Sequence, residues 1–374
     1  MRVYLDNNAT TAVAPEVAGA LARALASGPL NPGSPHASGR AARAKFEEAH
    51  ASVLDTLGLV GNYRVVFCAS ATEAANIALH GLSRSKHARK MVLSAVEHTA
   101  VALAAEAAGA VQFSRIHPDG RLDLDDFRAC CNDAALAAIM FANNETGALH
   151  PIEEIAGLCR GWRLPLLVDC CQAPGKTDFF DSIARARPEM LLLAGHKLHA
   201  PVGIAALVVA SSIPLRAIQS GGGQQHGLRP GTEPIALALA FAAALKLAKE
   251  RFDGEAFHRK TTMLWNAIQT VAPHAQLTVP DPQRRLANTL HYRVPGLSAE
   301  RQIVAFDLAG LECSSASACE SGSAQPSKVM LAMGYSREQA LEGVRLSLSR
   351  YTTDDDTAFA CKILREVLTR LLQA

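Results

Sequence analysis

The stretch Met190-Leu191-Leu192-Leu193-Ala194-Gly195-His196-Lys197-Leu198-His199-Ala200-Pro201 decides how the rest of the chain is interpreted. Its short apolar run followed by glycine predicts a buried strand that ends near Gly195. Ligands gather at such strand ends in open α/β sheets. Lys197 lies there, and a buried lysine is costly unless it has a partner or a covalent function. Two interpretations stand at this point: a loop lysine that reaches solvent, and a Schiff-base lysine that holds an aldehyde cofactor.

Length and composition limit the class of protein and its compartment. The chain has 374 residues, 49% hydrophobic and 19% charged, with a formal net charge of +2. This length predicts two domains, or one large domain with an appendage. The balanced charge gives no reason to expect nucleic acid or an anionic membrane as a partner. No apolar signal core opens the chain and no apolar run is long enough for a membrane span, so we expect a cytoplasmic protein.

The cysteines fit the same compartment. There are nine of them, and no two are spaced as Cys-x-x-Cys. This pattern matches neither a disulfide framework nor a zinc ribbon and is expected in a reducing cytoplasm. His196 and His199 could share a face, but no matching cysteine pair is spaced for a site, so we expect no resident metal.

Hydrophobic periodicity predicts alternating strands and helices over the first two thirds of the chain. The predicted strands are 64–67, 91–94, 111–113, 137–141, 164–169, 190–193 and 204–209. Helical patterns occupy 15–27, 38–57, a segment that opens near Thr72, 99–108, 122–131 and 152–162. Such alternation predicts a mostly parallel sheet covered by helices.

The remainder of the chain predicts a smaller, mixed domain. Two helices, at about 233–250 and 255–270, follow a glycine-rich loop and lead into it. Strands at 289–294 and 344–348, a helix at 299–309, a loop at 312–327 and a closing helix complete it.

An acid and a lysine are expected at neighbouring strand ends. Asp169 closes the buried run Leu166-Leu167-Val168-Asp169, where it could simply cap the next helix. Alternatively, it could keep a pyridinium nitrogen protonated, so that the ring accepts electrons. The interval from Asp169 to Lys197 leaves room for one crossover to an adjacent strand. This pair is what pyridoxal phosphate requires.

Two further features are compatible with the same cofactor. Phe67-Cys-Ala-Ser-Ala-Thr-Glu73 is a strand that feeds a helix N-terminus, where free amides and the helix dipole favour a phosphate; an ordinary cap is the alternative. His98 follows the strand 91–94 and is expected at the same sheet edge. An imidazole there could stack on a cofactor or move protons, or it could be a satisfied core histidine.

Taken together, these motifs resemble those of the cysteine desulfurases, pyridoxal-phosphate enzymes of the class V aminotransferase group. The matching segments run in order from residue 4 to 353 and cover nearly the whole chain. Several of them resemble in particular the NifS-type, nitrogenase-associated branch. The segments are Tyr4-Leu-Asp-Asn-Asn-Ala-Thr-Thr11, Ala71-Thr72-Glu73, Glu97-His98, Asn143-Asn-Glu-Thr-Gly147, Asp169 with Gln172, Gly195-His196-Lys197, Arg229-Pro-Gly-Thr232, Ser314-Ser-Ala-Ser-Ala-Cys319 and Val344-Arg345 with Ser349-Arg-Tyr-Thr-Thr353.

The resemblance implies a fold and an assembly. The fold would be that of the fold-type I pyridoxal-phosphate transferases, an α/β architecture with a mostly parallel, seven-stranded sheet in the large domain. The large, cofactor-binding domain would span 15–254. A smaller α+β domain, formed by 1–14 and 255–374, would carry the loop with the catalytic cysteine. Two copies of the chain would form a homodimer.

The resemblance also assigns roles around the cofactor ring. Lys197 would bind the cofactor aldehyde covalently and later act as base at the substrate Cα. Asp169 would pair with the ring nitrogen, and Gln172 with the phenolic oxygen. His98 would stack on the ring and take part in catalysis.

Phosphate and substrate would be held by a second set of residues. Ala71-Thr72 and His196 would bind the phosphate, joined by Thr232 from the other subunit. Asn144 and Arg345 would grip the carboxylate of L-cysteine, for which a bidentate arginine is well suited.

Cys319 distinguishes the reaction. It lies in a stretch of small and polar residues without apolar periodicity, which suits a nucleophile that must travel. By resemblance, Cys319 attacks the substrate sulfur and becomes a persulfide, and the product is L-alanine. The long form of this loop is similar to that of the branch that supplies iron–sulfur scaffold proteins. A NifU-like scaffold would then be the acceptor, whose cluster Cys319 could contact transiently.

The chain departs from the family pattern at three positions. Ala194 stands where the family often has a serine that binds phosphate, Ser70 where it often has glycine, and Val202 where it usually has lysine. Losing one neutral hydrogen bond would weaken cofactor retention by about 1 kcal/mol. Ser70 offers a replacement hydroxyl, and no catalytic group is lost.

Three alternatives remain beside cysteine desulfuration. The first is an aminotransferase or a selenocysteine lyase on the same fold, and the second is a sulfur-relay scaffold that has lost catalysis. The third is a metal-binding protein. The sequence leaves open the identity of the sulfur acceptor, the choice between nitrogenase and general iron–sulfur assembly, and the selectivity for cysteine over selenocysteine.

Overall fold

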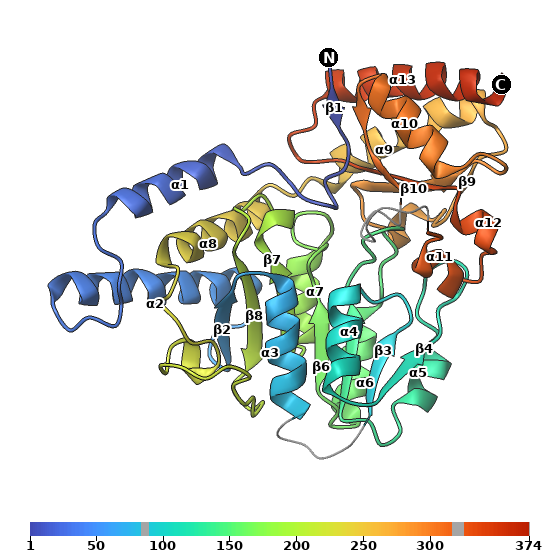
Figure 1. The fold of residues 1–374 in the computed structure, drawn as a ribbon. Helices are drawn as coiled ribbons and strands as arrows, with labels where there is room; N and C mark the ends of the chain where they lie inside the picture. Colours follow the sequence, from blue (N-terminus) through green and yellow to red (C-terminus); the bar gives the residue numbers. More distant parts are fainter. Residues whose placement is uncertain (84–89, 316–324, 374) are drawn as a thin grey trace.

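The computed structural model describes residues 1–83, 90–315 and 325–373. Within these ranges the buried apolar side chains form two separate clusters. The larger cluster lies around the main sheet, and the smaller one unites Val3 and Leu5 with residues from Phe257 onward. Figure 1 shows the two corresponding bodies one above the other, with both termini in the upper one. The predicted division into 15–254 against 1–14 and 255–374 stays a prediction, and the two clusters are the observation that bears on it.

The larger sheet has seven strands and is mostly parallel. Six of these strands run in the same direction, and β8 runs in the opposite one, antiparallel to both of its neighbours, β2 and β7. In spatial order the strands are β2 (Tyr63–Cys68), β8 (Ala205–Ala210), β7 (Met190–Ala194), β6 (Leu166–Asp169), β5 (Leu136–Met140), β3 (Met91–Ser94) and β4 (Val111–Ser114).

The connections explain these strand directions. The link 195–204 between β7 and β8 is shorter than the dozen or so residues that a parallel crossover takes, so β8 turns back. Helix α7 (Phe179–Ala186) fills the connection from β6 to β7, and these two strands are parallel neighbours. The predicted crossover from Asp169 to Lys197 is therefore confirmed.

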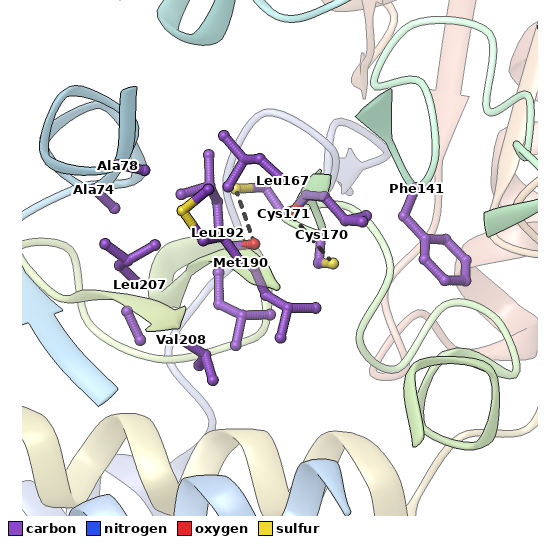
Figure 2. Close-up of a cluster of buried hydrophobic side chains, with 14 of the residues drawn as sticks. Ala74, Ala78, Phe141, Leu167, Cys170, Cys171, Met190, Leu192, Leu207 and Val208 are labelled. Atoms are coloured by element: carbon purple, nitrogen blue, oxygen red, sulfur yellow. Dashed lines mark hydrogen bonds between the residues drawn. The ribbon is translucent and has the colours of Figure 1, made fainter. Parts of the chain in front are cut away.

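Helices cover both faces of this sheet, because its central strands are buried on both sides. In Figure 2, Ala74 and Ala78 of α3 lie on the same side of the strands as Leu207, while Val208 points to the opposite side. Helices α3 and α4 pack together, as do α8 with α1 and α2. The remaining helices of this body are α1 (Pro15–Ala26), α2 (Ala37–Leu57), α3 (Ala71–Ser83), α4 (Thr99–Ala108), α5 (Leu124–Cys130), α6 (Ile152–Gly161) and α8 (Ile235–Glu250).

The smaller body contains an antiparallel sheet covered by long helices. Its strands, in order, are β12 (Ser314–Ser315), β13 (Gly343–Ser347), β10 (Thr289–Arg293) and β9 (Gln276–Leu277). A separate parallel pair joins β1 (Val3–Tyr4) to β11 (Leu311–Glu312), so the N-terminus belongs to this body. Its helices are α9 (Gly254–Val271), α10 (Ala299–Leu308), α11 (Lys328–Ala332), α12 (Arg337–Ala340) and α13 (Asp354–Gln373).

The structure differs from the sequence-based expectations mainly in short elements. The prediction of a loop over 312–327 is wrong at its start, because β11 (Leu311–Glu312) reaches Glu312 and β12 occupies Ser314–Ser315. A two-residue strand has no periodicity to detect, and its ladder to β13 is what defines it. Residues 316–324 lie outside the described residues. In the part of the chain that the structure describes, no helix is both long enough and apolar enough to span a bilayer.

Candidate active site

A cavity of about 440 Å³ lies at the carboxyl ends of the strands of the large sheet. Met140, Asp169 and Ala194, the last residues of β5, β6 and β7, all line it. This volume falls in the range of small-ligand sites. The cavity brings together nine of the predicted site residues, namely Ala71, Thr72, His98, Asn144, Asp169, Gln172, His196, Lys197 and Arg345.

Lys197 is half-buried in the short 3-10 turn Gly195–Lys197 that follows β7. Glycine is required at the start of this turn, because a Cβ at Gly195 would lie 2.6 Å from the carbonyl oxygen of Ile204. The N-terminal segment holds the turn in place. The backbone N–H and the hydroxyl of Thr11 both donate to the carbonyl oxygen of His196, at 2.8 and 2.9 Å. These contacts determine where the Lys197 side chain enters the cavity.

Asp169 lies at the end of the strand next to Lys197, and its Oδ1 accepts a hydrogen bond from the Cys171 N–H at 2.9 Å. A second carboxyl, Glu97, is buried nearby and accepts from the Met140 N–H at 2.6 Å. Burial, and then the charge of Asp169, raise the pKa of Glu97 well above its usual range. Because burial and a neighbouring negative charge both disfavour a second carboxylate, Glu97 favours the protonated form.

Gln172 is oriented by a buried lysine. The Lys176 ammonium donates to Gln172 Oε1 at 2.7 Å and to Asn8 Oδ1 at 3.1 Å. The other end of the amide, Gln172 Nε2, donates to the Asn8 carbonyl oxygen at 2.9 Å. Because the lysine nitrogen donates to one end of the amide and the other end donates to a carbonyl oxygen, the two contacts together fix which way Gln172 points. Burial, and then the charges of Lys197 and Arg345, lower the pKa of Lys176 well below its usual value.

His98 is the N-cap of α4, and its Nδ1 accepts from the Ala100 N–H at 3.1 Å. In the neutral ring the proton is therefore on Nε2. Burial, and then the positive charge of Lys197, lower the pKa of His98, while Asp169 opposes the effect. The residue thus presents a neutral imidazole at the cavity wall.

The N-terminus of α3 forms another part of the cavity wall. Its first N–H groups have no partner within the helix, and Ala71 and Thr72 both line the cavity. Ser70 Oγ accepts from the Glu73 N–H at 3.2 Å and still has its own proton to donate. Ser70 and Ala194 line the same cavity, and the role of the Ser70 hydroxyl as a replacement stays a prediction.

His196 also lines the cavity. Its Nδ1 lies 3.2 Å from Thr10 Oγ1. Burial, followed by the charges of Lys197 and Lys176, lowers the pKa of His196 to about 4. At neutral pH it can therefore donate one neutral hydrogen bond to an anion.

Arg345 enters the cavity from the small body and is 4% exposed. One terminal nitrogen of its guanidinium donates to the Asn144 carbonyl oxygen at 2.8 Å, and the other donates to Asp6 Oδ1 at 2.5 Å. Its Nε is buried and has no partner among the described residues. This N–H can donate a hydrogen bond to one further acceptor group.

Two predicted site residues remain besides these nine. Thr232 is exposed in the loop before α8 and does not line the cavity. Its predicted role is in the other subunit's site, and that role stays a prediction. Cys319 lies outside the described residues. The described chain ends at Ser315 before the gap that contains Cys319. The residue before it, Ser314 of β12, pairs in register with Arg345 of β13.

Several residues that the structure places at the site had no role predicted from the sequence. Asp6 and Asn8 belong to a polar run that looks like a turn, and Lys176 follows a Pro-Gly pair that looks like a loop. Glu97 was noted only as the neighbour of His98. For Asp6 and Asn8, the signal in the sequence is that their polar run directly follows an apolar residue, Leu5. In the described ranges, no group of three or more metal-ligating side chains is close enough to hold a metal ion.

Comparison with known proteins agrees with this geometry. The aminotransferase class-V family model matches residues 3–358. A cysteine desulfurase NifS from Azotobacter vinelandii is 35% identical, covering 98% of this chain and 91% of that protein. An IscS-like cysteine desulfurase from Mycobacterium tuberculosis is 31% identical over 99% of this chain and 97% of its own. The crystal structure of a NifS-like protein from Rickettsia africae matches with a TM-score of 0.88 at 26% identity, covering 98% and 99% of the two chains.

The chain therefore belongs to the class-V aminotransferase family and, within it, to the pyridoxal-phosphate-dependent cysteine desulfurases. The cavity fits this cofactor. It offers an amine at Lys197 for the aldehyde, a carboxylate at Asp169 for the ring nitrogen, and the free amides of the α3 N-terminus for the phosphate.

Proposed function

We propose that this chain converts L-cysteine into L-alanine and holds the released sulfur as a persulfide on Cys319. The observation that carries the proposal is the single cavity at the carboxyl ends of the strands. It unites the Lys197 amine, the Asp169 carboxyl group, the N-terminus of α3 and the Arg345 guanidinium, which come from distant parts of the chain. No ordinary packing requirement would bring these groups together.

Around the cofactor, each residue has one proposed task. Asp169 pairs with the ring nitrogen, Gln172 donates to the phenolic oxygen, and His98 lies against the ring as a neutral imidazole. The phosphate binds at Ala71-Thr72 and His196. Bound pyridoxal phosphate supplies the sink for the electrons that the substrate releases when it loses its Cα proton.

The substrate and its protons are handled by other residues. Arg345 and Asn144 bind the carboxylate of L-cysteine, which orients the Cα–H bond. Lys197 holds the cofactor and, once substrate is bound, takes the Cα proton on its side-chain nitrogen.

Sulfur transfer requires a thiol that can ionise. The S–S bond forms as the Cys319 sulfur attacks the substrate sulfur, and the C–S bond of the substrate breaks as its carbon gains a proton. The eight described cysteines are poor candidates, since burial raises the pKa of every one of them. Figure 2 shows the Cys170 and Cys171 thiols directed at backbone carbonyl groups inside the core. By elimination, Cys319 is the best candidate for the acceptor.

The Cys319→Ala variant tests this proposal. We expect it to lose alanine and sulfide production from L-cysteine by roughly 100-fold or more, as when a group that reacts directly is removed. The mass of wild-type protein incubated with cysteine should increase by one sulfur atom. Cys313→Ala is the matched control, because burial raises the pKa of Cys313 to about 12, and it should remain active.

The same experiment separates the alternatives. Undiminished turnover by Cys319→Ala would support an aminotransferase or a selenocysteine lyase and would contradict a persulfide on Cys319. A wild-type protein that binds the cofactor but releases no alanine from cysteine would instead support a sulfur-relay scaffold without catalysis.

The destination of the sulfur is a further part of the proposal. We propose that the chain acts in the cytoplasm as a homodimer and supplies a NifU-like scaffold during iron–sulfur cluster assembly for nitrogenase. The relative named NifS supports the nitrogenase assignment. The IscS-like relative is nearly as similar and supports a general role in cluster assembly as the second candidate.

A further inference from the structure

In the structure, the arginine that is proposed to bind the substrate carboxylate is already paired with a carboxylate. Arg345 donates to Asp6 Oδ1 at 2.5 Å, and the two side chains are 4% and 21% exposed. Both residues line the cavity. Asp6 belongs to the N-terminal segment and Arg345 to β13, so the contact joins residues 339 positions apart.

The backbone of Asp6 is anchored, while its side chain can turn. Ser347 N–H donates to the Leu5 carbonyl oxygen at 2.7 Å, and Asn7 N–H donates to the Ser347 carbonyl oxygen at 3.2 Å. The Tyr4 hydroxyl donates to the Asp6 carbonyl oxygen at 3.0 Å. These bonds hold the main chain on both sides of Asp6 and use none of its carboxylate oxygens. Rotation of the side chain therefore breaks the ion pair without disturbing the segment.

The pairing has a physical reason. A guanidinium that is almost fully buried needs a partner, because an uncompensated buried charge is strongly destabilising. Asn144 supplies only a neutral carbonyl oxygen, and Arg345 Nε has no partner among the described residues. Asp6 is the only carboxylate that forms an ion pair with Arg345 in the described part of the chain. It thus neutralises Arg345 when no substrate is bound.

We propose that Asp6 is an internal competitor for the α-carboxylate of the substrate, pairing with Arg345 in the free site and releasing it when an amino acid binds. The inference rests on the proposed role of Arg345. A substrate carboxylate has the same charge and shape as the Asp6 side chain, so the two exchange at one guanidinium. The free site stays neutralised, and each ligand has to displace Asp6, which lowers its apparent affinity.

The experiment compares two ligands of the holoenzyme, L-alanine and L-alaninamide, which lacks the carboxylate. Binding is followed by the change in absorbance of the bound cofactor and, independently, by the rise in melting temperature with ligand concentration. Asp6→Asn keeps the shape of the side chain and removes its charge. We expect this variant to bind L-alanine roughly fivefold more tightly and L-alaninamide unchanged. We expect the same result for Asp6→Ala, which replaces Asp6→Asn in the experiment if that variant does not fold.

Arg345→Gln distinguishes failure of this inference from failure of the proposed function. If Arg345 binds the carboxylate, this variant loses the preference for L-alanine over L-alaninamide. In the Arg345→Gln background, Asp6→Asn should then have no effect on either ligand. Weaker or unchanged binding of L-alanine by Asp6→Asn, with Arg345→Gln behaving as expected, would overturn the competitor role and leave the role of Arg345 intact. An Arg345→Gln variant that keeps the preference would overturn both.

Discussion

His150 is a buried residue whose two ring nitrogens have no hydrogen-bond partner among the described residues. It is 4% exposed, and burial lowers its pKa to about 4. A histidine in the unfolded chain has a pKa of about 6.5. The folded state therefore keeps His150 neutral where the unfolded state begins to bind a proton.

This difference predicts a loss of stability in acid. Neutral His150 contributes fully to the free energy of unfolding above about pH 6.5. This contribution is lost as the pH falls towards 4, and the total loss is about 3 kcal/mol at most. His150→Leu removes the titrating group, so its free energy of unfolding should fall less steeply between pH 6.5 and 4 than that of the wild type. Denaturant unfolding at several pH values measures this. Parallel pH profiles for the two proteins would contradict the prediction.

At the scale of a single element, β13 carries Arg345, the proposed carboxylate ligand, and pairs with β12, the last described strand before Cys319. It lies between β10 and β12, and Arg345 is its central residue. Gly343 allows this packing, because a Cβ there would lie 2.8 Å from His291 Nε2 and 2.9 Å from Met330 Sδ. The position of the strand, and with it that of Arg345, depends on the absence of a side chain at Gly343.

Gly343→Ala should therefore affect both stability and substrate binding. Overpacking of this kind costs about 1–3 kcal/mol, so the melting temperature should fall. KM for cysteine should rise more than kcat falls, since the displaced strand carries Arg345. Gly157→Ala is the matched control: it lies in α6 with no atom within 4 Å of the added Cβ. There, alanine should stabilise the helix by up to about 1 kcal/mol. An unchanged KM for Gly343→Ala would show that β13 does not set the position of Arg345.

At the scale of the whole molecule, the two bodies meet at the cavity. The large body contributes Lys197 and Asp169 from its strand ends, and the small body contributes Arg345 from β13 and Asp6 from the N-terminal segment. Figure 1 shows this segment descending from the small body along the top of the large one. The proposed dimer would add Thr232 of a second copy to the phosphate end.

Mixed dimers test whether Thr232 acts across the subunit boundary. Thr232→Asp places a carboxylate against the phosphate and should strip the homodimer of cofactor through charge repulsion. A dimer of one Thr232→Asp chain and one Lys197→Ala chain has one complete site if Thr232 acts in the other subunit, and none if it acts in its own. Dimers purified through two different affinity tags should regain about half of the wild-type activity. Mixed dimers without activity would show that Thr232 serves its own subunit or that the chain is not a dimer of this kind.

Local patterns in the sequence determined much of this protein. The apolar runs before Asp169 and Lys197 placed both residues at strand ends, because a buried parallel strand has to be apolar along its length. The resemblance of the motifs predicted the cofactor, the seven-stranded sheet and the family. Short elements such as β12 were missed, because two residues carry no periodicity. The roles of Cys319 and Thr232 remain predictions.

Tertiary structure alone decided which side chains meet in the cavity. Neither the pairing of Asp6 with Arg345 nor the contact of Lys176 with Asn8 has a local signal, since each joins segments far apart in the chain. A polar residue in a turn looks the same whether it faces solvent or a buried cation. Its partner is set by the packing of the two bodies, because a buried charge takes whatever compensating group the fold brings within reach.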